Sequence, residues 1–253
     1  MVRKRISIGV QAACMFDCEA RVPLMVYAKL RGIMVKDPVD LAVVRRGRLI
    51  HEVFQAVATR MAGEDRITDS VAVKQELARE ITIAMPELDT SVVSQHATKL
   101  ASAIRETATT TPAETITHER RVSVPLTEKV KLSGRIDTIA GDASGRVIIE
   151  RKSGEARPWH AAQVQLYAEM LVAMEPETKI DRLELWYSRF GTRVVPCTSG
   201  ELLAGLTSSA ARGEALTEKG AVAAVESWCA ACPRVDCGVK RICGVLGISD
   251  FNL

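Results

Sequence analysis

Asp137, Glu150 and Lys152 lie in two runs that otherwise alternate like β-strands, "SGRIDTIA" and "GRVIIERKS". Residues two apart share one face of a strand, so Glu150 and Lys152 project together while Ile149 and Arg151 point the other way. Two carboxylates and a strand carbonyl make an oxygen site that suits Mg²⁺ or Mn²⁺. A neighbouring lysine can hold a water molecule or stabilise a developing negative charge. Taken alone, the three residues fit better with a cross-strand salt bridge on a solvated face.

Two other parts of the chain carry side chains that could complete such a site. Gln163 and Tyr167 stand four residues apart in a helical pattern, and so lie on one face of that helix. His51 lies in "GRLIHEVFQ", within another helical pattern. A single helical histidine is more often a surface or core residue than a ligand. The ordered set of a His, an Asp, a Glu-x-Lys and a Gln-x-x-x-Tyr is more specific than any one member.

The elements that must position these residues begin with helices and continue with strands. Gly63, Pro86 and Pro158 punctuate the helical periodicity, and the Gly-rich "GDASG" predicts a hairpin between two alternating runs. The expected helices cover 18–30, 41–63, 70–85, 90–108 and 159–174, with another beginning at Ser199. The expected strands cover a short N-terminal segment, 117–126, 129–140, 145–153 and 182–190. This order predicts an α/β domain with an antiparallel hairpin that leads into a helical crossover.

Composition bounds the function without choosing it. The chain has 253 residues, of which 47% are hydrophobic, so it can bury a sizeable core. A net charge of +3 permits an anionic partner, while 4% aromatic residues argue against an aromatic stacking platform for bases. No apolar run approaches the roughly 18 residues of a membrane span, and the N-terminal apolar stretch is too short for a signal peptide. The sequence therefore predicts a cytoplasmic protein with no membrane contact.

The seven cysteines are unevenly distributed. In an intracellular chain they are better candidates for metal ligands or free thiols than for disulfides. A four-cysteine site accepts either tetrahedral zinc or an iron–sulfur cluster, and chemistry alone would place zinc first. The candidates cluster at the two ends of the chain: Cys14, Cys18, Cys229, Cys232, Cys237 and Cys243.

The segments "GRLIHEVFQ", "GRID", "IIERKSG" and "QVQLY" together resemble the RecB-type nucleases of the PD-(D/E)XK superfamily, over about residues 47–170. The resemblance implies a restriction-endonuclease-like core, a mixed sheet flanked by helices, and hydrolysis of phosphodiester bonds in DNA. It implies that His51, Asp137 and Glu150 bind Mg²⁺ or Mn²⁺, and that Lys152 supports the attacking water.

The same resemblance assigns a role to the helix after the hairpin and to the cysteines. Gln163 and Tyr167 would help to position DNA and the active site. Several RecB-type nucleases bind an iron–sulfur cluster through one cysteine before the core and a C-x2-C-x5-C tail after it, and the small free-standing ones are the CRISPR-associated RecB-like exonucleases. The length and the cysteine layout of the chain resemble that group. This resemblance makes an iron–sulfur cluster, rather than zinc, the preferred occupant of the cysteine site.

The implied cluster, 4Fe–4S rather than 2Fe–2S, would use Cys18, Cys229 and Cys232, with Cys14 as the alternative to Cys18. The tail departs from the family pattern because four residues, not five, separate Cys232 from Cys237. The fourth ligand is therefore either Cys237 or Cys243. Zinc remains the alternative occupant.

The resemblance implies a metal-dependent exonuclease that acts on single-stranded DNA ends and trims DNA before spacer integration in CRISPR adaptation, with the integrase complex as a partner. The alternatives are a RecB-like repair nuclease working with a separate helicase, and a non-catalytic DNA-binding protein with a structural zinc site. The expected organisation is a helical region at 1–112 that contributes one cysteine and the histidine, a nuclease core at 113–198, and a cysteine-rich module at 199–253 packing back on the N-terminus.

Overall fold

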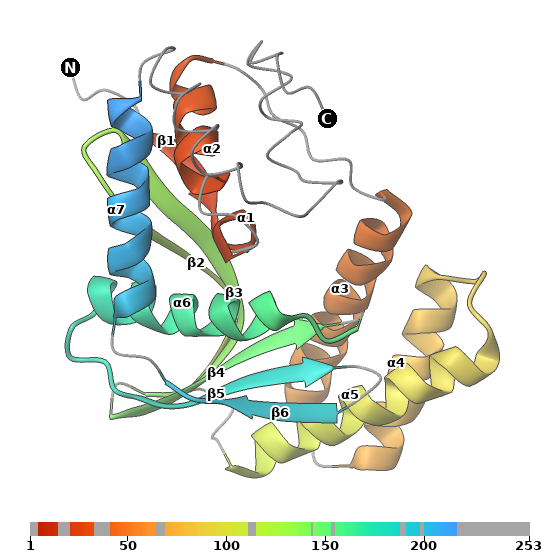
Figure 1. Ribbon diagram of the computed structural model, residues 1–253. Coiled ribbons are helices and arrows are strands. Elements are labelled where there is room, and N and C mark those ends of the chain that lie inside the picture. The colour runs from red at the N-terminus through yellow and green to blue at the C-terminus, as the bar shows by residue number, and fades with distance from the viewer. Residues whose placement is uncertain are drawn as a thin grey trace. The chain divides into compact units, whose positions relative to one another are not determined.

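The computed structural model describes residues 5–14, 21–32, 41–63, 69–110, 115–142, 144–152, 155–187, 191–197 and 200–216 (Figure 1). The chain divides into two compact units. One unit comprises the described residues within Met1–Pro38, Val122–Gly134 and Thr198–Leu253. The other comprises those within Val39–Arg121 and Arg135–Cys197.

Six strands form one mixed sheet in the order β1-β3-β4-β5-β6, with β2 paired to β3. β3 and β4 are antiparallel, β4 and β5 are parallel, and β5 and β6 are antiparallel. This confirms the expected α/β class with a mixed sheet and flanking helices. The strands are β1 (Ile6–Gly9), β2 (Ile116–Pro125), β3 (Val130–Asp142), β4 (Gly145–Lys152), β5 (Ile180–Tyr187) and β6 (Gly191–Val195).

In the second unit, helices cover both faces of β4 and β5. α6 (Pro158–Met174) contacts β4, β5 and β6. On the other face, Ile149 and Trp186 belong to a hydrophobic core made with the helices that precede the sheet. Those helices are α3 (Leu41–Gly63), α4 (Ser70–Ala84) and α5 (Thr90–Thr110).

The β3–β4 hairpin predicted from "GDASG" is present, with pairs from Thr138↔Ile149 to Asp142↔Gly145. Gly141 has a φ of 98°, and a Cβ there would lie 2.2 Å from the carbonyl oxygen of Gly145. Only glycine fits both the left-handed backbone and this close approach. The turn therefore fixes the register that brings β3 and β4 together beside the site.

The first unit joins the N-terminal elements to the last described helix. β1 pairs in parallel with the start of β3, and α1 (Val10–Cys14) follows β1. α2 (Arg21–Leu30) packs against α7 (Glu201–Ala215). The approach is closest at Gly213, where a Cβ would lie 2.5 Å from the carbonyl oxygen of Pro23 and 2.7 Å from Cβ of Val26.

We expect Gly213→Ala to lower the stability of the protein, whereas Gly205→Ala on the same helix should raise it. Alanine favours a helix interior by about 1 kcal/mol over glycine, so both changes gain that preference. Nothing lies within 4 Å of a Cβ at Gly205, but a Cβ at Gly213 would enter the backbone of α2. Such overpacking typically costs about 1–3 kcal/mol. Thermal unfolding of both variants measures the difference, and a Gly213→Ala protein as stable as Gly205→Ala would contradict this packing.

The expected helices and strands are confirmed where the structure describes them, but the sequence reading missed α1 and β6. "GTRVV" is only five residues long and carries exposed polar side chains, so it lacks the alternation that marked the other strands. The domain boundaries expected at 112 and 198 stay a prediction. None of the described helices is long and apolar enough to cross a membrane.

Candidate active site

Asp137 is fixed at the point where the β3–β4 ladder ends. The β3–β4 ladder ends at the antiparallel pair Thr138↔Ile149. One residue further on, Oδ2 of Asp137 accepts the backbone N–H of Arg151 at 2.7 Å. The carboxylate thus takes the place of a backbone acceptor, and only 5% of Asp137 is exposed. Because a buried N–H must find an acceptor, this hydrogen bond holds the carboxylate at the end of the hairpin.

Glu150 and Lys152 lie on the α6 face of β4, as their spacing predicts, and meet Gln163 from α6. The ammonium of Lys152 donates to Oε1 of Glu150 and to Oε1 of Gln163, both at 2.8 Å. Nε2 of Gln163 donates to the same Glu150 oxygen at 2.8 Å and lies 3.4 Å from the hydroxyl of Tyr167. Burial, and then the charge of Glu150, raise the pKa of Tyr167, so its hydroxyl stays protonated. Four predicted site residues therefore form one connected cluster.

His51 reaches the same place from α3. Its Nδ1 lies 3.5 Å from Oδ1 of Asp137. Ligand atoms of His51, Asp137 and Glu119 all lie within 4.8 Å of one another. Glu119 comes from β2 and has a φ of 54°, which is rare outside glycine, and its Oε2 lies 2.6 Å from Nε of Arg135. The structure thus adds Glu119, which sequence reasoning did not single out, to the predicted His51 and Asp137.

Arg151 supports the cluster from the opposite face of β4. Its guanidinium donates to the hydroxyl of Thr138 at 3.0 Å and lies 3.4 Å from Oε1 of Glu119. The guanidinium carbon stands 4.2 Å from the ring centroid of Phe54, one turn after His51 on α3. Such a cation–π contact is worth about 2 kcal/mol when it is desolvated. Arg151 therefore links the strand that carries Glu150 to the helix that carries His51.

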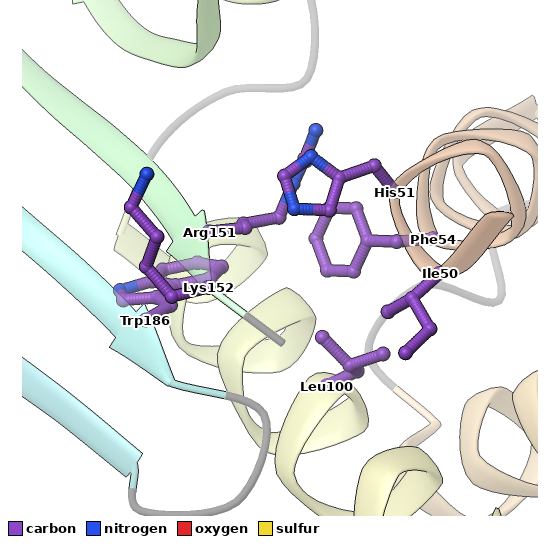
Figure 2. A pocket seen from close by; sticks show the side chains of 7 residues that line it. All are labelled: Ile50, His51, Phe54, Leu100, Arg151, Lys152 and Trp186. Atoms are coloured by element: carbon purple, nitrogen blue, oxygen red, sulfur yellow. The ribbon is translucent and has the colours of Figure 1, made fainter. Parts of the chain in front are cut away.

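A pocket opens between α3, α5 and these strands in the second unit. Figure 2 shows His51 pointing from α3 toward Arg151, with Lys152 and Trp186 on the neighbouring strands. His51 and Lys152 both contribute to the lining of this pocket. Its lining consists of Ile50, His51, Phe54, Leu100, Arg151, Lys152 and Trp186.

The pKa values of the two buried carboxyls are shifted in opposite directions. Burial raises the pKa of Asp137, but the hydrogen bond and charge of His51, followed by the charge of Arg151, outweigh burial and hold that pKa well below its ordinary value. Burial, followed by the charge of Asp137, raises the pKa of Glu150 to about 7, against the opposing effect of Lys152. Asp137 is therefore charged at neutral pH, whereas burial favours the protonated form of Glu150.

This donor set fits a divalent cation. His51, Glu119 and Asp137 bring a ring nitrogen and two carboxylate oxygens within 4.8 Å of one another, and these are ligands that Mg²⁺ and especially Mn²⁺ accept. Glu150, which the sequence predicts as a ligand, does not belong to this group of three, and its role as a ligand stays a prediction. Oε2 of Glu150 is buried and has no hydrogen-bond partner among the described residues. A cation would satisfy this oxygen and would displace the proton that burial keeps on the carboxyl.

We expect Mn²⁺ binding to weaken as the pH falls through about 7, the pKa of Glu150. Because that pKa is raised, the carboxyl is protonated on the acid side, and each bound cation must release a proton there. Calorimetric titration in buffers of different ionisation enthalpy measures both affinity and proton release. Glu150→Gln should bind more weakly and without this proton release. An affinity that is equal at about pH 6 and about pH 8 would exclude Glu150 as a ligand.

The two residues that sequence reasoning missed carry little sequence signal. Glu119 lies in "THERRVSV", at no fixed spacing from the other acids. Arg151 is the intervening residue of the Glu-x-Lys pattern, on the face that alternation assigns to the core. A charged residue at a core position was the available signal, since buried arginines need partners. The predicted cysteines Cys18, Cys229, Cys232, Cys237 and Cys243 lie outside the described residues.

Comparison with known proteins agrees with this geometry. No curated protein matches the chain. A family model described as the PD-(D/E)XK nuclease superfamily matches residues 17–244, which contain every element from α2 to α7 and the whole cluster. Asp137, Glu150 and Lys152 all lie within the matched residues. The chain therefore belongs to the PD-(D/E)XK nuclease superfamily.

Proposed function

We propose that this protein is a Mg²⁺- or Mn²⁺-dependent DNA exonuclease that acts on single-stranded ends. The observation that carries the proposal is the pairing of two buried carboxylates with basic side chains: Nδ1 of His51 lies 3.5 Å from Asp137, and the ammonium of Lys152 donates to Glu150 at 2.8 Å. Paired carboxylates beside a lysine are suited to hydrolysis of a phosphodiester, because that reaction needs a cation site and a positive charge near the attacking water.

Each residue has a distinct role in this proposal. His51, Asp137 and Glu150 would hold the cation, which when bound polarises the phosphate and activates water as a nucleophile. The ammonium of Lys152, held 2.8 Å from both Glu150 and Gln163, would orient the water and balance negative charge. Gln163 fixes Lys152 and Glu150 relative to each other, since it bonds to both.

The preference for single-stranded ends and the role in CRISPR adaptation, with the integrase complex as partner, rest on the cysteine layout and on the resemblance to CRISPR-associated RecB-like exonucleases. A repair nuclease working with a separate helicase is the second candidate for the same chemistry. Cleavage of end-labelled linear and of circular single-stranded DNA, with and without Mn²⁺, tests the proposal. Linear DNA should be shortened from an end, circular DNA should survive, and chelation should stop the reaction. Cleavage of the circle would make the protein an endonuclease.

We also propose an iron–sulfur cluster that joins the two ends of the chain. In the first unit, α2 packs against α7, with a backbone approach that excludes a Cβ at Gly213. Cys18 precedes α2 in the sequence, and Cys229 and Cys232 follow α7. Packing of these helices supports a ligand set drawn from both ends.

Protein purified without oxygen should be brown and contain iron, and Cys229→Ser or Cys232→Ser should remove the colour. Serine is a poor replacement for thiolate toward iron. The same changes should lower thermal stability, because a bound cluster stabilises the fold. Between Cys237→Ser and Cys243→Ser, only the change at the true ligand should bleach the protein, while Cys197→Ser serves as control. Colourless protein with one zinc ion would reject the cluster in favour of zinc.

A further inference from the structure

Trp159 continues the row of site residues along α6. It precedes Gln163 by four positions, as Gln163 precedes Tyr167, so the three side chains lie on one face of the helix. The ammonium of Lys152 lies 5.7 Å from the centroid of the Trp159 ring. The indole is only partly buried. A partly exposed aromatic ring therefore stands directly beside the lysine of the cluster.

The orientation of Trp159 is set by its neighbours. Its ring packs edge-on against His160, with centroids 4.2 Å apart and an angle of 82° between planes. Nδ1 of His160 accepts the backbone N–H of Arg157 at 3.3 Å, and the hydroxyl of Tyr187 lies 3.0 Å from the same nitrogen. Burial, followed by the charges of Lys152 and Arg157, lowers the pKa of His160 to about 4. A neutral, hydrogen-bonded histidine thus holds the indole in place.

Two arginines lie near this part of the site. Arg157 is two residues before Trp159. Burial raises the pKa of Tyr187, whose hydroxyl lies 3.0 Å from His160, and the charge of Arg193 acts against this rise. Arg157 immediately precedes α6, and its side chain is 60% exposed. Its ion pair with Glu155, at 3.7 Å, involves a side chain that is 72% exposed, and such pairs contribute little. Arg193 on β6 is exposed and lies opposite Leu185 in the β5–β6 ladder. Its side chain is therefore on the face of the sheet that Tyr187 and Lys152 share.

We propose that Trp159, Arg157 and Arg193 form a subsite for a nucleotide next to the scissile phosphate in single-stranded DNA. Trp159 stacks on an unpaired base, and the two arginines pair with the flanking phosphates. The low aromatic content of the chain does not oppose this, because one ring that is already oriented is enough for one base. The subsite rests on the proposed nuclease function and adds the requirement that the base be unpaired, since a paired base does not expose its face.

A set of labelled 20-nucleotide single strands tests this subsite. Each strand carries one abasic site, and the position of that site differs from strand to strand. Binding is followed by fluorescence anisotropy in chelator, so that no cleavage occurs. In the wild-type protein, one abasic position should weaken binding about tenfold, as expected for one stacked base. Trp159→Leu should bind the intact strand about tenfold more weakly and should no longer respond to that position. Trp159→Phe should recover part of the loss, which a purely structural role would not predict.

The arginines give an independent readout. Arg157→Gln and Arg193→Gln should each reduce the slope of log affinity against log salt concentration by about 0.7, the value for one phosphate contact on a single strand. The matched control is Lys179→Gln, an exposed lysine that is paired with Asp181 at the other end of β5 and should leave affinity unchanged.

A set of abasic strands to which Trp159→Leu and the wild type respond alike would overturn the subsite. So would unchanged salt slopes in both arginine variants. Cleavage of the same strand by the wild-type protein separates the two proposals. If the wild type cleaves but Trp159 has no effect, the subsite fails and the nuclease stands. If it neither binds nor cleaves single strands, both fail. If Trp159→Leu does not fold, Trp159→Phe and the arginine variants decide.

Discussion

Asp137→Asn is expected to reduce DNA cleavage by more than about 100-fold while the protein stays folded. Residues that only support a metal ligand typically cost 10- to 100-fold when replaced, so a direct ligand should exceed that range. Asparagine removes the charge that Asp137 keeps at neutral pH through its low pKa. It retains a carbonyl oxygen that can accept the backbone N–H of Arg151, which Oδ2 of Asp137 now accepts at 2.7 Å.

Asp137→Ala provides the comparison, because it removes the charge and the acceptor together. A buried N–H without a partner costs about 1–3 kcal/mol, so the alanine protein should unfold at a lower temperature than the asparagine protein. Both should be equally inactive. Asp181→Asn, an exposed aspartate on β5, should keep full activity and stability. The assignment of Asp137 is wrong if Asp137→Asn cleaves DNA at the wild-type rate in Mn²⁺.

The second large effect is expected for Lys152→Met, which should lower the cleavage rate on the order of 100- to 1,000-fold, the range for losing one group that stabilises charge in a transition state. The same change should also alter metal binding. Lys152 lowers the pKa of Glu150, which nevertheless lies at about 7. Without the lysine that pKa rises further, so Mn²⁺ affinity should fall at neutral pH and recover at about pH 9, while cleavage does not recover.

Lys152→Arg separates the two effects of the lysine. Arginine keeps a positive charge beside Glu150, so the pH dependence of Mn²⁺ binding should stay close to that of the wild type. Its planar guanidinium cannot occupy the position of an ammonium bonded to both Glu150 and Gln163, so cleavage should still be lost. Wild-type cleavage by Lys152→Met at about pH 9 would show that Lys152 acts only through the pKa of Glu150.

Local periodicity accounts for the residues that sequence analysis placed correctly. A period of two puts Glu150 and Lys152 on one face of β4, and a spacing of four puts Gln163 and Tyr167 on one face of α6. These patterns need no knowledge of the tertiary fold. They also predicted the hairpin, because two glycines bracket a short polar turn.

The features of the site that could not be predicted from the sequence depend on contacts between residues that are far apart along the chain. The hydrogen bond from the backbone N–H of Arg151 to Asp137 depends on where the β3–β4 ladder ends. A strand prediction places such an end only to within a few residues. Glu119 reaches the cluster because one residue of β2 takes a left-handed backbone, and no spacing rule encodes that. The alternation placed Arg151 on the face opposite Glu150 and Lys152, but its partners Phe54 and Glu119 lie far away in sequence.

The left-handed backbone of Glu119 has a consequence for protein engineering. A non-glycine residue in this conformation typically sacrifices about 1–3 kcal/mol of stability. A laboratory selection for heat resistance should therefore favour glycine at this position, in combination with an uncharged residue in place of Arg151, whose buried charge would otherwise lose a partner. A selection for cation binding should keep the glutamate, because its carboxylate lies within 4.8 Å of the ligand atoms of His51 and Asp137. Heat resistance and cation binding would then compete at a residue that no sequence motif identifies.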